Sequence, residues 1–140
     1  MKAKNRIIPY EQVVISQTNM NYLRAWVVDL RSGKYTQGKY RLRTIRDEYC
    51  CFGVLMNIVC PGEWEKRGDL YTIRGLSSTV PVGMLGNVLQ ARVRIPPPRN
   101  ARVLSSVIIR MNDAEQRDFL YIADAIEGFL ERILVRKDEL

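Results

Sequence analysis

The chain has 140 residues, of which 46% are hydrophobic and 26% are charged, so it predicts one small globular domain and excludes wholesale disorder. Lysine and arginine number 22 against 15 aspartates and glutamates, which gives a net charge of +7 and points toward anionic partners. The chain contains no histidine, which excludes Ser-His-Asp and Cys-His catalytic sites and histidine-ligated metals.

The first part of the chain, residues 1–17, is predicted to be a basic N-terminal arm, with a strand at the β-branched run Val13–Ile15. A helix is expected at about residues 19–32, since Thr18 or Asn19 can cap its first turn. The apolar residues of this segment recur at helical spacing: Leu23, Trp26, Val27 and Leu30. Gly33 then suits the end of the helix.

Residues 33–47 have two glycines and a polar majority, which predicts a long loop. Long loops in compact domains are uncommon and often carry function. Gly33, Gly38 and Lys39 match the spacing of a phosphate-binding loop, but Tyr40 stands where that motif needs serine or threonine. A predicted helix also precedes the segment where the motif needs a strand, so we exclude a phosphate-binding loop.

The middle of the chain is predicted to contain several short elements. A second helix is expected at about residues 48–59, and a hairpin at residues 62–78. A third helix is expected at about residues 79–89, with a proline in its first turn. Residues 90–95 alternate as a strand does, and the three prolines at 96–98 predict a stiff extended connector.

The last part of the chain predicts a buried segment at residues 103–109, either strand or short helix, and then a long helix at about residues 114–136. Asn112 or Asp113 is expected to cap that helix. The sequence as a whole predicts an α+β fold, in which residues 18–140 form a single small domain with a few short strands. Its helices are expected at about residues 19–32, 48–59, 79–89 and 114–136.

The charges are unevenly distributed along the chain. Arg24 to Arg46 holds seven basic residues and one acidic residue, and Arg92 to Arg110 holds five basic residues and no acidic ones. Asp113 to Glu131 holds six acidic residues and one arginine. The basic loop can therefore pair with the acidic helix within the fold, or the basic face of one copy can meet the acidic face of another, which favours a homodimer.

The basic loop interleaves cations with tyrosines, which suits a partner that carries both phosphates and bases. An acidic protein surface would use the same residues. The candidate binding residues for an anionic partner are Lys34, Tyr35, Lys39, Tyr40, Arg41, Arg43, Arg46, Arg92 and Arg94.

Three cysteines, Cys50, Cys51 and Cys60, predict buried reduced thiols rather than a disulfide framework or a metal site. Arg46 could depress the pKa of a nucleophilic Cys50 or Cys51, but the sequence offers no recognisable base. We therefore expect no enzymatic activity, no catalytic residue, no cofactor and no metal.

Two stretches of the chain form a combined pattern. The first contains Leu30-Arg-Ser-Gly-Lys-Tyr-Thr-Gln-Gly-Lys39, Leu42-Arg43 and Tyr49-Cys-Cys-Phe-Gly-Val-Leu55. The second contains Met111-Asn-Asp113, Phe119, Ile122-Ala-Asp124 and Ile126-Glu127. This pattern resembles a family of small phage and prophage proteins of largely uncharacterised function. Phe52 and Met111 stand where the family pattern has leucine, and residues 61–110 do not match it.

The resemblance implies a phage origin and a small domain, but no known activity. We expect a non-enzymatic binding protein, a counter-defence or host-takeover inhibitor whose basic loop acts on nucleic acid or on a host protein or nucleoprotein complex. One alternative is a protein that sequesters a small nucleotide signal in a pocket lined by Tyr35, Tyr40 and arginines. Another is a structural or assembly component of the phage particle. The chain shows no signal peptide and no membrane span, which predicts a soluble protein in the host cytoplasm.

Overall fold

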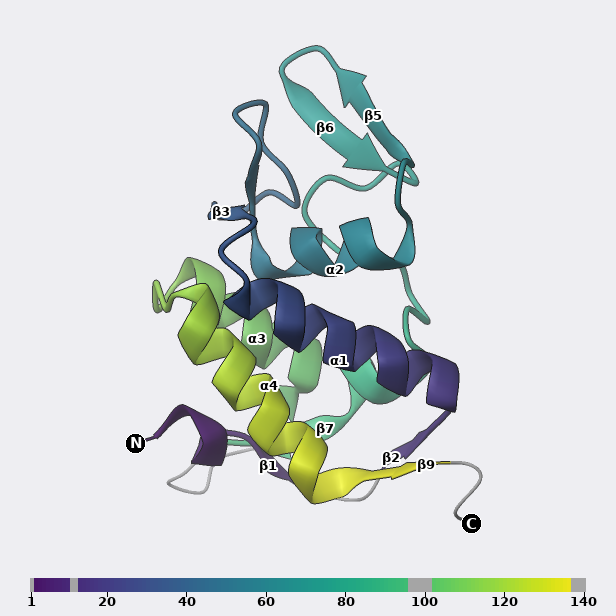
Figure 1. Ribbon diagram of the computed structural model, residues 1–140, viewed down its shortest axis with the longest axis vertical. Helices are drawn as coiled ribbons and strands as arrows, with labels where there is room; N and C mark the ends of the chain where they lie inside the picture. Colours follow the sequence, from purple (N-terminus) through teal and green to yellow (C-terminus); the bar gives the residue numbers. More distant parts are fainter. Residues whose placement is uncertain (1, 11–12, 96–101, 137–140) are drawn as a thin grey trace.

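The computed structural model describes residues 2–10, 13–95 and 102–136 and confirms an α+β fold (Figure 1). In these residues the α-helices are α1 (Gln17–Arg31), α2 (Cys51–Val59), α3 (Leu104–Asp113) and α4 (Phe119–Ile133). Two 3-10 turns accompany them, η1 (Ala3–Asn5) and η2 (Val88–Gln90). The helices pack on one another around a single apolar core, and the strands lie at its borders (Figure 1).

The strands form small separate sheets. One is antiparallel with the order β1 (Ile8–Pro9), β7 (Arg92–Arg94) and β8 (Arg102–Val103). Two parallel pairs join β2 (Val13–Ile15) to β9 (Leu134–Arg136), and β3 (Thr36–Gln37) to β4 (Glu48–Tyr49). The antiparallel hairpin of β5 (Trp64–Arg67) and β6 (Leu70–Ile73) projects beyond α2 at the top of Figure 1.

The core forms where α1 packs against both α2 and α4. Trp26 of α1 is fully buried, and its indole N–H donates a hydrogen bond of 2.8 Å to the main-chain oxygen of Cys51. Residues 51–56 of α2 are all buried, so this helix has no exposed face in its first turn and a half. A helix that is apolar on every side stays in place through tertiary packing and not through amphipathic character.

The first predicted helix is confirmed, but its N-cap differs from the expected one. Ser16 caps α1 by accepting a hydrogen bond of 3.1 Å from the Asn19 main-chain N–H, so Thr18 and Asn19 lie inside the helix. Gly33 follows the helix with a φ of +78°, the left-handed conformation that commonly ends helices. The strand at Val13–Ile15 is confirmed as β2.

The helix expected at residues 79–89 is wrong. This segment forms consecutive turns and then η2. Gly83, Leu85 and Gly86 have φ values of +84°, +59° and +69°, which a right-handed helix cannot include. The proline near the start of this segment favoured a helix, but the two glycines with positive φ values make it a series of turns.

The long C-terminal helix is shorter than predicted at both ends. Residues 104–113 form α3 and Val103 ends β8, so the segment at residues 103–109, left open between strand and helix, is helical from residue 104. Gln116 has a φ of +55°, and Asp118 begins α4 by accepting a hydrogen bond of 2.8 Å from the Tyr121 main-chain N–H. Asn112 and Asp113 thus end α3, and the expectation that they cap the last helix is wrong. Residues 134–136 form strand β9.

The remaining predicted elements are largely confirmed. The second helix begins at Cys51, because residues 48 and 49 belong to β4. The hairpin within residues 62–78 and the strand within residues 90–95 are present. The proline connector predicted at residues 96–98 lies outside the described residues. Within the described part of the chain, no helix combines the length and the apolar character needed to cross a membrane.

The N-terminal segment packs onto the body of the fold where it is described. Ile7 is fully buried, and η1 lies against α4. A Cβ atom at Gly128 of α4 would overlap the main-chain oxygen of Lys4. Glycine at this position therefore lets residues 2–10 lie directly on α4.

Candidate nucleic-acid interface

The loop at residues 33–47 is anchored to the core by Asn112. The Asn112 side chain is fully buried, and its oxygen accepts hydrogen bonds from Gln37 Nε2 at 2.9 Å and from the Cys51 main-chain N–H at 3.2 Å. Its nitrogen donates to the Gly38 main-chain oxygen at 2.9 Å and to Asp113 Oδ1 at 2.8 Å. One buried amide therefore joins the loop, the start of α2 and the end of α3.

A second anchor holds the middle of the loop against α2. The side chain of Leu42 is fully buried, and its main-chain N–H donates to the Ser77 oxygen at 2.8 Å. The Leu42 main chain passes so close to α2 that a Cβ atom at Gly53 would overlap its carbonyl oxygen. The loop therefore packs against α2 so closely that only glycine fits at residue 53.

The side chain of Arg43 is used within the fold. Its guanidinium carbon lies 3.9 Å from the ring centre of Tyr71, 5.4 Å from that of Tyr49 and 5.6 Å from that of Trp64. The same group donates hydrogen bonds of 2.9 and 2.6 Å to Asp47 Oδ1. Arg43 thus fastens the loop to the hairpin through cation–π contacts, which leaves it little freedom to meet a partner.

The side chain of Tyr35 is also held by contacts within the fold. Its ring meets Tyr49 edge-on at 4.9 Å, and its hydroxyl accepts a hydrogen bond of 2.9 Å from Asn57 Nδ2. Asn57 Oδ1 in turn accepts a bond of 3.0 Å from the Trp64 indole. Lys34 is exposed and lies 3.8 Å from Asp29 Oδ2, a long contact for an ion pair.

The outer part of the loop exposes three cations and one aromatic ring. Lys39, Arg41 and Arg46 are exposed, and none has an ion pair or hydrogen-bonded side chain within residues 2–10, 13–95 and 102–136. Tyr40 is 67% exposed with a φ of +67°, and its main-chain N–H donates to Asp113 Oδ1 at 3.0 Å. With the exposed Ile45, these residues form the loop surface, made up of Lys39, Tyr40, Arg41, Ile45 and Arg46.

The structure does not bring Arg92 and Arg94 to the loop surface. Both belong to β7, which lies at the end of the molecule opposite the hairpin and β3 (Figure 1). Arg92 is exposed, whereas Arg94 is half-buried with its guanidinium 5.6 Å from the ring centre of Tyr10. The nine candidate binding residues predicted from the sequence thus lie in two separate places. Seven are on the loop at residues 33–47, and Arg92 and Arg94 are on β7.

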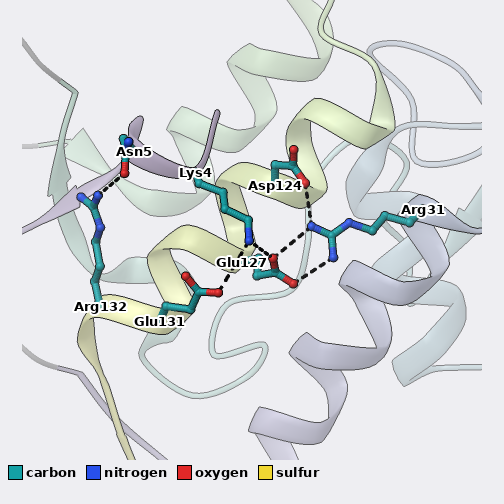
Figure 2. A network of polar contacts seen from close by, with 7 residues as sticks. All are labelled: Lys4, Asn5, Arg31, Asp124, Glu127, Glu131 and Arg132. Atoms are coloured by element: carbon teal, nitrogen blue, oxygen red, sulfur yellow. Dashed lines mark hydrogen bonds and ion pairs between the residues drawn. The ribbon is translucent and has the colours of Figure 1, made fainter. Parts of the chain in front are cut away.

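The acidic helix pairs mainly with cations outside the loop surface (Figure 2). Arg31 of α1 contacts Asp124 at 2.6 Å and Glu127 at 2.9 Å. Lys4 of the N-terminal segment contacts Glu127 at 2.6 Å. The expected pairing of the basic segment with the acidic helix is therefore present at Arg31, and the three cations of the loop surface take no part in it.

Glu127 offers a test of this network. Hydrogen bonds from Arg31 and then Lys4 lower the pKa of Glu127 from its ordinary 4.5 to about 2. A carboxylate with a lowered pKa stabilises the fold above pH 4.5, and this contribution is lost as the pH falls toward 2. We expect Glu127→Gln to lose about 1 kcal/mol at neutral pH, since the group is partly solvent-screened, and to match the wild type near pH 2. Urea unfolding across this pH range measures the difference, and a gap that persists in acid would contradict the network.

The cysteine thiols are poorly suited to nucleophilic chemistry. All three are free and buried, as predicted. Burial raises the pKa of Cys50 to about 11 and raises that of Cys51 well above its ordinary range. Arg46 is exposed on the loop, whereas both thiols are buried. The described residues contain no cluster of three or more acidic or cysteine side chains able to hold a metal ion.

Sequence reasoning missed the anchoring role of Asn112 and the close approach at Gly53. The sequence offered one signal for these contacts, namely that the two stretches of the combined pattern occur together. Gln37-Gly38, Cys51 and Asn112-Asp113 meet in one hydrogen-bond cluster, and Arg31 meets Asp124 and Glu127. Residues from the two stretches of the combined pattern therefore contact one another in the fold.

A comparison with family models assigns the chain to a family. The model described as Domain of unknown function (DUF8296) matches residues 19–130, and the chain belongs to this family. Comparisons with curated proteins and with solved structures give no match. The matched range begins in α1 and ends in α4, so it contains the loop surface and both of its anchors.

Proposed function

We propose that this member of the DUF8296 family is a binding protein, rather than an enzyme, and that its loop surface binds single-stranded nucleic acid. The observation that carries the proposal is that one loop exposes three cations, which have no ion pair among the described residues, together with the ring of Tyr40. Cations neutralise phosphates, and an exposed aromatic ring stacks on an unpaired base. The proposal therefore assigns backbone contacts to Lys39, Arg41 and Arg46 and base stacking to Tyr40.

The anchoring of the loop supports the same proposal. Asn112 holds the main chain just before the loop surface, at Gly38, and Leu42 and Arg43 hold it between Arg41 and Ile45. A binding loop that is ordered before it meets its partner loses less conformational freedom on binding. The loop surface is therefore arranged to hold its cations and ring in fixed relative positions.

The wider biological role stays a prediction from the resemblance to phage proteins. That prediction includes a phage origin, a host target and action as a counter-defence inhibitor in the host cytoplasm. The alternatives of nucleotide sequestration and of a place in the phage particle also stay predictions. Tyr35 is engaged with Asn57 and Tyr49, which favours an open surface around Tyr40 over a pocket lined by both tyrosines.

The proposal is tested with a triple variant that replaces Lys39, Arg41 and Arg46 with alanine. Fluorescence anisotropy with a labelled oligothymidine should show an affinity lower by roughly 100-fold at moderate salt. Each lost phosphate contact reduces the slope of log K against log salt by about 0.7 for a single strand. The triple variant should therefore lower that slope by about 2.

A matched control removes the same charge from other surfaces. Lys66, Arg92 and Arg102 are exposed cations outside the loop, and replacing all three with alanine should change the affinity by less than about threefold. Equal losses in the two triple variants would contradict a defined loop site, as would the absence of any binding. If polyglutamate competes as well as the oligonucleotide, the loop surface binds an acidic protein instead.

Tyr40→Ala separates stacking from charge. It should weaken oligothymidine binding by roughly tenfold while leaving the salt slope unchanged, because base stacking contributes about 1–3 kcal/mol and releases no counterion. Anisotropy titrations at several salt concentrations measure both quantities. An unchanged affinity would remove Tyr40 from the binding surface.

A further inference from the structure

The outward residues of α1 and α4 (Figure 1) carry charges in two rows, one basic and one acidic. These helices lie side by side, and Arg31 near the end of α1 meets Asp124 in the first half of α4, so they run antiparallel. On α1 the spacing of the outward residues is helical: Arg24, Val28 and Arg31. On α4 it is likewise helical: Leu120, Asp124, Glu127 and Glu131. We call these seven residues the α1/α4 face.

The α1/α4 face carries two large apolar side chains that are exposed to solvent. Val28 is 64% exposed and Leu120 is 57% exposed. Between the helices lies an open groove of about 440 Å³, to which Val27, Val28 and Leu130 contribute apolar walls. Apolar side chains framed by charges are the usual composition of a contact surface.

Ion pairs close only one end of this groove. Arg31 bridges to Asp124 and Glu127, as Figure 2 shows. At the other end Arg24 and Glu131 line opposite sides of the groove without contacting each other. Arg24 has no ion pair among the described residues, and the carboxylate of Glu131 is 61% exposed and 3.8 Å from Lys4 Nζ. Arg24 is thus unpaired among the described residues, and Glu131 is largely exposed with one long ion pair to Lys4.

We propose that the α1/α4 face is the contact surface between two copies of this chain. A twofold axis that runs along the groove, parallel to the helices, places α1 of each copy over α4 of the other. The basic row of one copy then meets the acidic row of the second. Arg24 of each copy faces Glu131 of the other, so this contact occurs twice, and Val28 lies one helical turn further along α1 in the same interface.

The charge arrangement selects a second copy over other occupants. A row of cations beside a row of anions is complementary to itself after a twofold rotation. Nucleic acid would be repelled by Asp124, Glu127 and Glu131, and a partner of one charge sign would match only one row. The loop surface does not overlap this face, so dimerisation and nucleic-acid binding are independent. The homodimer favoured by the sequence is thereby assigned to helix contacts and not to the basic loop.

Charge reversal tests the proposal directly. Sedimentation equilibrium of the wild type, over a series reaching millimolar concentration, should give a mass of twice 16.2 kDa that falls toward 16.2 kDa at high salt. Arg24→Glu alone and Glu131→Arg alone each create two like-charge contacts in the dimer. Each should weaken dimerisation by roughly 100-fold.

Mixing the two variants supplies the decisive comparison. A heterodimer of Arg24→Glu with Glu131→Arg has an opposite-charge pair at both contacts, so the mixture should dimerise with wild-type affinity. The chain that carries both substitutions should do the same. Circular dichroism confirms that each variant is folded.

Further variants keep the proposal open to contradiction. Val28→Asp should abolish the dimer, whereas Val82→Asp, at an exposed apolar position in a turn, should leave it unchanged. A wild-type mass of 16.2 kDa at every concentration would overturn the proposal. So would a wild-type dimer that both charge reversals leave intact, or single variants whose mixture stays monomeric.

Discussion

Replacing Gly53 with alanine is expected to destabilise the fold by about 3 kcal/mol or more. The added Cβ would occupy the space of the Leu42 main-chain oxygen, and neither this loop nor α2 can retreat without leaving the core. Helix propensity alone predicts that the substitution stabilises the fold, because alanine in a helix interior is favoured over glycine by about 1 kcal/mol. Urea unfolding followed by circular dichroism therefore decides between close contact and propensity.

Gly75→Ala provides the control for Gly53→Ala. Gly75 has a φ of +78°, and a Cβ atom there would meet no other atom within 4 Å. Its loss should be about 1–2 kcal/mol, the conformational cost of a side chain in the left-handed region. A stabilised Gly53→Ala protein, or one no worse than Gly75→Ala, would contradict the seating of the loop on α2.

Gly53 also shows why periodicity predicted the helix but not its surroundings. The pattern at residues 48–59 depends on which residues are apolar, and α2 followed from that pattern. A glycine within such a run normally only weakens the prediction. That Gly53 admits the main chain of Leu42 depends on how two segments cross in space, which local pattern does not contain.

The failed helix at residues 79–89 has a different cause. Pro81 suits a first helical turn, and the apolar residues that follow allow helical spacing. Gly83 and Gly86 were nevertheless the stronger signals, since both adopt positive φ values. Turn chemistry outweighed apolar spacing in this short segment.

The candidate site was located in part by the sequence. Lys39, Tyr40, Arg41 and Arg46 were selected from local composition, and all of them are exposed on the loop. Composition could not show that Arg43 lies on the ring of Tyr71, because Tyr71 comes from the hairpin. Whether a cation is free or already paired is decided by tertiary contacts.

Asn112→Ala is expected to destabilise the protein by about 3–4 kcal/mol, since it leaves several buried polar groups without partners. The Cys51 main-chain N–H and the Gly38 main-chain oxygen both lose a hydrogen bond. Asn57→Ala is the control, because Asn57 is only partly buried and joins Tyr35 to Trp64 near the surface. Its loss should be about 1 kcal/mol. Similar losses in the two variants would contradict the anchoring role of Asn112.

Asn112→Asp separates the acceptor role of the side chain from its donor role. The new carboxyl keeps an oxygen for Gln37 and Cys51, but its second oxygen would face the Gly38 carbonyl and the Asp113 carboxylate. Burial beside a like charge raises the pKa of such a group, so the folded state binds a proton more tightly than the unfolded chain. Stability lost at neutral pH should therefore return as the pH is lowered toward the ordinary pKa of an aspartate, opposite to the behaviour expected from Glu127. Because Asn112 also holds the loop surface in place, oligothymidine affinity should follow the same pH dependence, and an affinity that stays constant while stability recovers would separate the anchor from the proposed site.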